Sequence, residues 1–224
     1  MKCMSFQVFG LSVSRGIAIG RAVLIASSRV DVAHYFINDL QIDEEIERLR
    51  GARDAVFNEL SVLQRDLPSD APAELSALLD VHLMLLRDET LTLATKQWIQ
   101  ERHYNAEWAL SAQLEVLARQ FDDMEDDYLR ERKADIQQVA ERVLKVLTGS
   151  AHDLPRATGI DESNANMIVV ARDISPADMM QFRNVAFTGF VTDEGGQNSH
   201  TAIVSRSLGI PAVVGMGNAS RLIV

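Results

Sequence analysis

The spacing of hydrophobic residues divides the chain into three regions. Residues 6–26 contain short β-branched runs, Ile17-Ala18-Ile19 and Ala22-Val23-Leu24-Ile25, separated by glycines, and these predict strands and turns. From residue 43 to residue 147, hydrophobic residues recur at three- and four-residue spacing, which predicts amphipathic helices. From residue 154 onward, strand and helix patterns alternate. The pattern therefore predicts an α/β unit interrupted by a helical insertion.

The insertion is expected to hold helices over about residues 43–67, 73–86, 89–101, 106–121 and 126–147. Asp43 and Asn105 are the expected N-caps, and Gly149 is the expected C-terminal cap residue. Because the connections are short, these helices should pack as an antiparallel bundle. The expected domains are residues 1–30 with 150–224, and residues 31–149.

From residue 154 onward, the hydrophobic pattern predicts strands over residues 167–171, 185–192 and 211–215. Ser175 and Pro176 are typical of a helix start, as cap and first helical residue. A second helix is expected from His200 to Leu208, with Gly209 ending it.

Charge is distributed unevenly along the chain. The formal net charge is −10, and residues 31–150 hold 25 of the 32 acidic and 13 of the 22 basic residues. Such a surface repels nucleic acid and favours a basic protein partner, although plain solubility explains it equally well. No apolar run is long enough to span a membrane, and the single cysteine, Cys3, cannot form an internal disulfide. We therefore expect a cytoplasmic protein, and the end in Leu222-Ile223-Val224 suggests a fragment.

One candidate functional site consists of a strand, a glycine turn and a helix that begins at His200. The start of a helix offers unpaired backbone N–H groups to an anion, and Gly195 and Gly196 would let the backbone approach it. Ser199 and Thr201 would add hydroxyl donors. An imidazole at such a place keeps a free lone pair, as a nucleophile that attacks phosphorus requires. From spacing alone, His200 could also be a plain helix-start residue beside a tight turn.

Residues 195–215 resemble the phosphohistidine signature of phosphoenolpyruvate-utilising enzymes, through Gly195-Gly196-x-x-Ser199-His200-x-Ala202-Ile203, Arg206 and Gly209-Ile210-Pro211-Ala212-Val213-Val214-Gly215. The resemblance implies that His200 is the phosphorylated residue. It also implies an α/β phosphohistidine, or swivelling, domain. The supporting residues expected around the phosphoryl group are Gly195, Gly196, Ser199, Thr201, Arg206 and Ser175.

Within that family the chain is similar to the N-terminal half of enzyme I of the bacterial phosphotransferase system. The segments 82–89 and 126–135 look like its inserted helices, and Gly16-Ile17-Ala18-Ile19-Gly20 matches as well. That resemblance implies an all-α helical insertion that binds the carrier protein HPr. The residues expected to contact HPr are Glu74, His82, Met84, Leu85, Glu89, Leu91, Phe121, Leu129 and Arg132, although core packing explains any single apolar one.

The resemblance implies a phosphoenolpyruvate-protein phosphotransferase, a transferase that acts on a nitrogenous acceptor. His200 would carry a phosphoryl group derived from phosphoenolpyruvate and pass it to a histidine of HPr. Mg²⁺ and phosphoenolpyruvate would bind the C-terminal half of such an enzyme, so no cofactor or metal is expected here. As a fragment, the chain would be a monomer that exchanges phosphoryl with phospho-HPr only, whereas full-length relatives would be homodimers.

Two alternatives remain open from the sequence. One is the swivelling domain of a dikinase or synthase, which lacks the helical insertion. The other is a non-catalytic module that only binds HPr. One departure from the enzyme I pattern is Met179, where a threonine hydroxyl that holds the active histidine is expected. The histidine would then be oriented by water, a backbone carbonyl or Ser175.

Overall fold

The structure is a computed structural model that describes residues 6–25, 32–67, 69, 71, 73–123, 127–150, 166–182 and 187–223. Two compact units make up the chain. The first comprises Met1–Ser27, Pro68–Leu78 and Pro155–Val224, and the second comprises Ser28–Leu67 and Leu79–Leu154. The domain boundaries expected from the sequence stay a prediction.

The first unit is built on a five-stranded sheet in the order β1-β5-β4-β3-β2. Its strands are β1 (Leu11–Ser14), β2 (Arg21–Ile25), β3 (Met167–Ala171), β4 (Phe187–Thr192) and β5 (Ala212–Val214). Strands β2, β3, β4 and β5 are parallel to their neighbours, and β1 runs antiparallel to β5. Strand β3 is a run of apolar residues that are mostly buried, as expected for a parallel strand covered on both faces.

The prediction of a strand at Ile17-Ala18-Ile19 is wrong. Residues 15–20 form the connection between β1 and β2, and Ile17 and Ile19 are almost fully exposed. A strand forms instead at Leu11–Ser14, where pairing with β5 satisfies the backbone. β-Branched composition favours strands only where a neighbouring strand is available, and none pairs with residues 15–20.

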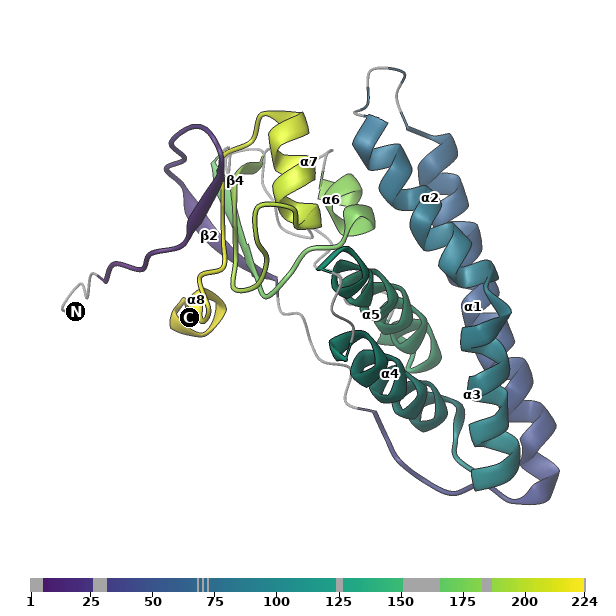
Figure 1. The fold of residues 1–224 in the computed structure, drawn as a ribbon. Coiled ribbons are helices and arrows are strands. Elements are labelled where there is room, and N and C mark those ends of the chain that lie inside the picture. The colour runs from purple at the N-terminus through teal and green to yellow at the C-terminus, as the bar shows by residue number, and fades with distance from the viewer. Residues whose placement is uncertain are drawn as a thin grey trace. The chain divides into compact units, whose positions relative to one another are not determined.

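Three helices accompany this sheet: α6 (Pro176–Phe182), α7 (His200–Leu208) and α8 (Ala219–Leu222). Helix α7 contacts β1, β4 and β5, and α6 packs against α7 (Figure 1). Helix α8 contacts β3 and β4. The predicted helix over residues 200–208 is confirmed, and Gly209 ends it in the left-handed conformation at φ 65°.

The second unit is helical (Figure 1). Its elements are η1 (Asp39–Gln41), α1 (Ile42–Arg65), most of α2 (Ala73–Arg87), α3 (Glu89–Arg102), α4 (Ala106–Asp122) and α5 (Asp127–Leu147). The expectation that Asp43 caps the first helix is wrong. Asn38 caps the preceding 3-10 turn in a capping box with Gln41, and Asp43 lies in the first turn of α1.

A charged cluster ties α1, α4 and the end of α5 together. The Arg48 guanidinium contacts the carboxylate of Glu45 at 2.6 Å, that of Glu107 at 2.5 Å and the carbonyl oxygen of Leu147 at 3.4 Å. Glu45 also accepts the backbone N–H of Ala106 at 2.7 Å and so caps α4. This explains why Asn105, the expected N-cap, makes no capping bond with its own side chain.

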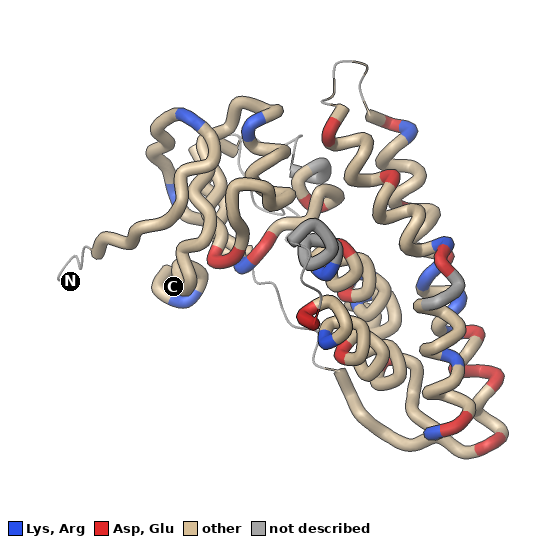
Figure 2. Tube along the Cα trace, in the orientation of Figure 1, with Lys and Arg blue, Asp and Glu red and all other residues tan. Residues whose placement is uncertain are grey.

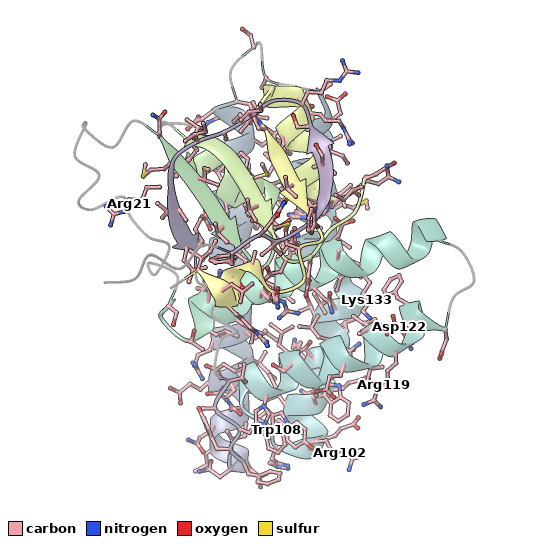
Figure 3. All side chains as sticks on the ribbon, turned by 90° about the vertical axis from the view of Figure 1, so that its left-hand side faces the viewer. Arg21, Arg102, Trp108, Arg119, Asp122 and Lys133 are labelled. Carbon is pink, nitrogen blue, oxygen red and sulfur yellow. The ribbon has the colours of Figure 1, made fainter. Side chains whose placement is uncertain are left out.

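Aromatic rings and a surface ion pair join further parts of the helical unit. The ring of Tyr104 stacks on that of Trp108 at 3.5 Å and on that of Trp98 at 5.7 Å. Lys133 of α5 pairs with Asp122 of α4 at 2.7 Å (Figure 3). Among the helices that the structure describes, none is both long and apolar enough to cross a membrane.

Candidate functional site

His200 is the first residue of α7 and is half-buried. The helix is capped by Ser199, whose hydroxyl accepts the backbone N–H of Ala202 at 3.3 Å. Within the described residues, the backbone N–H of Thr201 has no acceptor. The site therefore combines an imidazole with the positive end of a helix, an arrangement that favours a bound anion.

The two glycines before His200 have different roles. Gly195 adopts φ 108°, and a Cβ at this position would lie 2.9 Å from Oγ and 3.2 Å from Cβ of Ser199. A Cβ on Gly196 would meet nothing within 4 Å. Only Gly195 is therefore required by the backbone of the turn, and Gly196 leaves open space beside it.

The turn is held by bonds to the segment that follows β5. Gly215 donates its N–H to the carbonyl of Glu194 at 3.4 Å, and Gly217 donates its N–H to that of Asp193 at 2.9 Å. The carboxylate of Asp193 accepts both the N–H and the hydroxyl of Ser220, at the start of α8. These bonds fix the backbone that leads into Gly195.

A second contact fixes the same turn from the β3–α6 connection. The carboxylate of Glu194 is paired with the Arg172 guanidinium at 2.7 Å. The hydroxyl of Thr192 donates to the carbonyl of Glu194 at 2.7 Å. No role for Arg172, Asp193, Glu194 or Ser220 was predicted from the sequence. The only signal in the sequence for any of these four residues is that Asp193 and Glu194 directly precede Gly195.

The hydroxyls next to His200 do not face an external ligand as expected. Ser199 donates its proton to the carbonyl of Gly196 at 2.9 Å, so it holds the turn. Thr201 is fully buried, and its Oγ1 has no hydrogen-bond partner among the described residues. Its position on the inner face of α7 explains this, because the next residue of an α-helix points about 100° away from His200.

The remaining predicted support residues lie within the same unit. Arg206 is exposed, and its guanidinium donates to the carbonyl of Gln197 at 2.8 Å, which anchors the loop before the helix. Ser175 caps α6 by accepting the N–H of Asp178 at 3.2 Å, and its proton goes to the Asp178 carboxylate. Met179 on the same helix is buried. In this structure the Ser175 hydroxyl donates its proton to Asp178, so it is not available to donate to an imidazole.

The predicted carrier-binding residues differ in their exposure. Met84 and Glu74 are exposed, as docking residues should be. Leu85 and Leu91 line a small apolar pocket of about 20 Å³ together with Leu49, Leu110 and Val143 of the helical unit. Phe121 is half-buried, and the side chains of Glu89, Leu129 and Arg132 lie outside the described part.

His82 belongs to α2 and has an exposed fraction of 2%. Its Nε2 lies 3.6 Å from Oδ1 of the buried Asp135, so this contact joins α2 to α5.

Solved structures with a similar fold define the class of this protein. A solution structure of enzyme I is 30% identical, with a TM-score of 0.72 over 97% of this chain and 86% of that one. The N-terminal domain of an enzyme I described as nitrogen-type is 27% identical, with a TM-score of 0.62 over 97% of this chain and 87% of that one. The fold is thus an α/β phosphohistidine domain with an inserted all-α helical bundle.

Sequence relatives then give the family. Residues 9–132 match the family described as PEP-utilising enzyme, N-terminal, and residues 163–224 match PEP-utilising enzyme, mobile domain. A phosphoenolpyruvate-protein phosphotransferase of Cupriavidus necator is 56% identical over 98% of this chain and 38% of that protein. One of Listeria monocytogenes is 36% identical over 95% of this chain and 36% of that protein. The chain belongs to the PEP-utilising enzyme family, and it spans less than two fifths of these relatives.

Proposed function

We propose that this chain is a phosphoryl relay in which His200 carries the phosphoryl group. The observation that carries the proposal is the position of His200 at the first residue of α7, directly after a turn that requires glycine at Gly195. A phosphoryl group on the imidazole would be close to the N-terminal backbone of that helix, where negative charge is stabilised. Membership of the PEP-utilising family supports the same assignment.

The proposed exchange partner is a phosphohistidine on a small carrier protein of the HPr type. A ring nitrogen of His200 attacks phosphorus, a new N–P bond forms, and the N–P bond to the carrier histidine breaks. The carrier imidazole leaves with the electron pair of that bond. The reverse step returns the group, so no oxidant, metal or water is consumed. Such a transfer depends on positioning and on charge stabilisation, which the rigid turn can supply.

The proposed carrier surface lies on the helical unit. Acidic residues occur throughout this unit (Figure 2). Met84 of α2 is an exposed apolar side chain. A basic carrier would be attracted by the charge and would bury the apolar group. The relatives are named for transfer between phosphoenolpyruvate and a protein, which is consistent with a protein acceptor.

The two carboxylates of the turn before His200 are poorly placed to hold the Mg²⁺ that is expected to act with phosphoenolpyruvate in this family. Magnesium prefers carboxylate oxygens and water. Of the two carboxylates in the turn, Glu194 is paired with Arg172 and Asp193 with Ser220. No step of the proposed transfer therefore runs through a metal.

Two other functions can be separated from this one. The swivelling domain of a dikinase or synthase would carry phosphoryl on His200 without exchanging it with HPr. A non-catalytic binding module would bind HPr without becoming phosphorylated. The helical unit favours the relay over the first alternative, because that unit forms a second compact body.

The decisive experiment is intact-protein mass spectrometry after incubation with phospho-HPr. We expect a gain of one phosphoryl group that is lost in acid and retained in base, with fragment ions placing it on His200. The matched control is His103→Ala, since His103 is a histidine of the helical unit that pairs with Asp39 at 2.7 Å. His103→Ala should still be labelled, whereas His200→Ala should not.

The other outcomes discriminate between the functions. Labelling that persists in His200→Ala would overturn the assignment of the nucleophile. Binding of HPr without any labelling of the wild type would favour the module, and labelling by a nucleotide or phosphoenolpyruvate with none by phospho-HPr would favour the swivelling domain.

A further inference from the structure

The carboxyl ends of two neighbouring strands bring an arginine next to the turn before His200. Ala171 of β3 pairs with Thr192 of β4 in the parallel register. Beyond this pair, Glu194 donates its backbone N–H to the carbonyl of Arg172 at 2.9 Å. The backbone therefore places Arg172 and Glu194 side by side, independently of their charges.

The side chains of Arg172 and Glu194 form an ion pair that is partly exposed. Their nitrogen and oxygen atoms are 2.7 Å apart, and the two side chains are 41% and 54% exposed. An ion pair of this exposure contributes little to folding stability. The turn also has bonds that do not involve the pair, because the Glu194 carbonyl accepts the Thr192 hydroxyl and the Gly215 N–H. The effect of the pair on the site is therefore one of charge more than of structure.

The charge of this region matters because the site is proposed to receive an anion. Residues 192–206 contain two acidic residues, Asp193 and Glu194, and one basic residue, Arg206. Arg172 brings the summed charge of these four side chains to zero. A phosphoryl group on a side chain adds about −1.5 to −2 charges at pH 7. Without Arg172, that group would join a region that is already negative.

Glu194 is close enough to His200 for its charge to act there. A Cβ on Gly195 would lie 3.2 Å from Cβ of Ser199, so the residues next to these two are also near each other. Since consecutive Cα atoms are about 3.8 Å apart, the Cα atoms of Glu194 and His200 lie within about 14 Å of each other. Charges at such a separation interact at 10 mM salt, where the screening length is about 30 Å, and are largely screened at 1 M salt.

We propose that Arg172 stabilises the phosphorylated form of His200 by neutralising the charge of Glu194. Arg172 acts here through Glu194 and not on the reacting atoms. The ion pair thereby sets how far the exchange of a phosphoryl group with a carrier lies toward this chain. This inference rests on the proposed function and adds to it the residue that tunes the phosphoryl affinity of the site.

The equilibrium of phosphoryl exchange with HPr tests the sign of each charge. Each protein is mixed with phospho-HPr in 10 mM salt, quenched in base and analysed by intact-protein mass spectrometry. Arg172→Gln should lower the equilibrium constant for phosphorylation of the chain by about fivefold, and Glu194→Gln should raise it by about fivefold. The double variant should return to within about twofold of the wild type, and all differences should shrink at 1 M salt.

Two control variants separate the effect of charge from that of structure. Arg172→Lys keeps the charge and should behave like the wild type. Arg50→Gln loses the same charge from an exposed pair with Glu47 at 3.3 Å in the helical unit, and its equilibrium constant should not change. If the ion pair only held the turn, Arg172→Gln and Glu194→Gln would both lower the equilibrium constant. That result would contradict the role of Arg172.

Phosphoramidate, a small anionic phosphoryl donor, distinguishes this inference from the proposed carrier exchange. The N–P bond of the reagent breaks, a new N–P bond forms on the imidazole of His200, and the released ammonia takes up the imidazole proton as ammonium. The initial labelling rate should fall in Arg172→Gln and rise in Glu194→Gln, because the anion approaches a more or a less negative site. That pattern without any labelling by phospho-HPr would end the proposal of carrier exchange and leave the role of Arg172 standing. Labelling rates and equilibrium constants that are the same in both variants as in the wild type would end the role of Arg172.

Discussion

The carboxylate of Asp193 accepts hydrogen bonds from both the backbone N–H and the hydroxyl of Ser220, 27 residues further along the chain. Asp193 lies two residues before Gly195, so the turn that precedes His200 is anchored to the first turn of α8. The proposed phosphoryl site is therefore held by a part of the chain that contributes no group to the proposed chemistry.

Removing the hydroxyl should loosen this anchor. We expect Ser220→Ala to lower the free energy of unfolding by about 1–2 kcal/mol, because a bond to a buried carboxylate is lost. Urea titration followed by circular dichroism measures the loss. Ser220→Thr keeps the hydroxyl and should retain most of the stability. Equal losses in the two variants would show that the hydroxyl is not the stabilising group.

The two glycines of the turn provide a matched pair of variants. Gly195→Ala forces a side chain into φ 108° and against Ser199, so it should cost at least about 1–3 kcal/mol. It should also slow phosphoryl exchange with phospho-HPr by more than tenfold, since the helix cap is displaced. Gly196→Ala meets open space and should stay close to wild type in both measurements. The reverse order of severity would contradict the described turn.

Thr201 was expected to support the phosphoryl group, and its burial predicts a different result. A buried hydroxyl without a partner destabilises the folded state, so Thr201→Val should raise the free energy of unfolding by up to about 1 kcal/mol. The exchange rate with phospho-HPr should not change. Thermal melts and quenched-flow labelling test the two parts separately. A slower exchange in a stably folded Thr201→Val would restore the support role.

Arg48 separates two carboxylates that are almost completely buried. Arg48→Met leaves Glu45 and Glu107 close together without a counter-charge, which should cost about 2–3 kcal/mol after allowance for the partial exposure of Arg48. Burial disfavours the charged guanidinium, but hydrogen bonds to Glu45 and Glu107 outweigh burial and raise the pKa of Arg48.

The raised pKa of Arg48 determines how the stability contributed by this cluster changes at alkaline pH. A raised pKa means that the stabilisation is complete below the ordinary pKa of an arginine side chain and is lost only as the pH rises through the raised value. The difference in unfolding free energy between wild type and Arg48→Met should therefore be constant from pH 6 to pH 9. A difference that declines over this range would contradict the assignment of Arg48 as the permanent charge of the cluster.

Much of the helical structure could be predicted from local signals. Helix α7 runs from His200 to Leu208 as expected, because a serine cap and a terminal glycine act within a few residues of the helix they bound. Strand β3 also has its expected bounds, because an apolar run of five residues suits a covered parallel strand. Family resemblance then pointed to His200, which lies within the residues that match the mobile-domain family, and its role stays a prediction.

Other features depended on contacts that no local pattern encodes. Ile17 and Ile19 have strand-forming side chains, yet they lie in a loop because no strand pairs with them. Ser199 and Thr201 are adjacent hydroxyl residues, but one holds the turn and the other is buried.

The sequence by itself determined the helix that carries His200, the family and the presence of a helical insertion. Only the tertiary structure decided that Asp193 meets Ser220 and that Arg48 lies between Glu45 and Glu107. The physical reason is one of range. Caps and hydrophobic periods act over a few neighbouring residues, whereas these polar contacts exist only after folding brings distant backbone segments together.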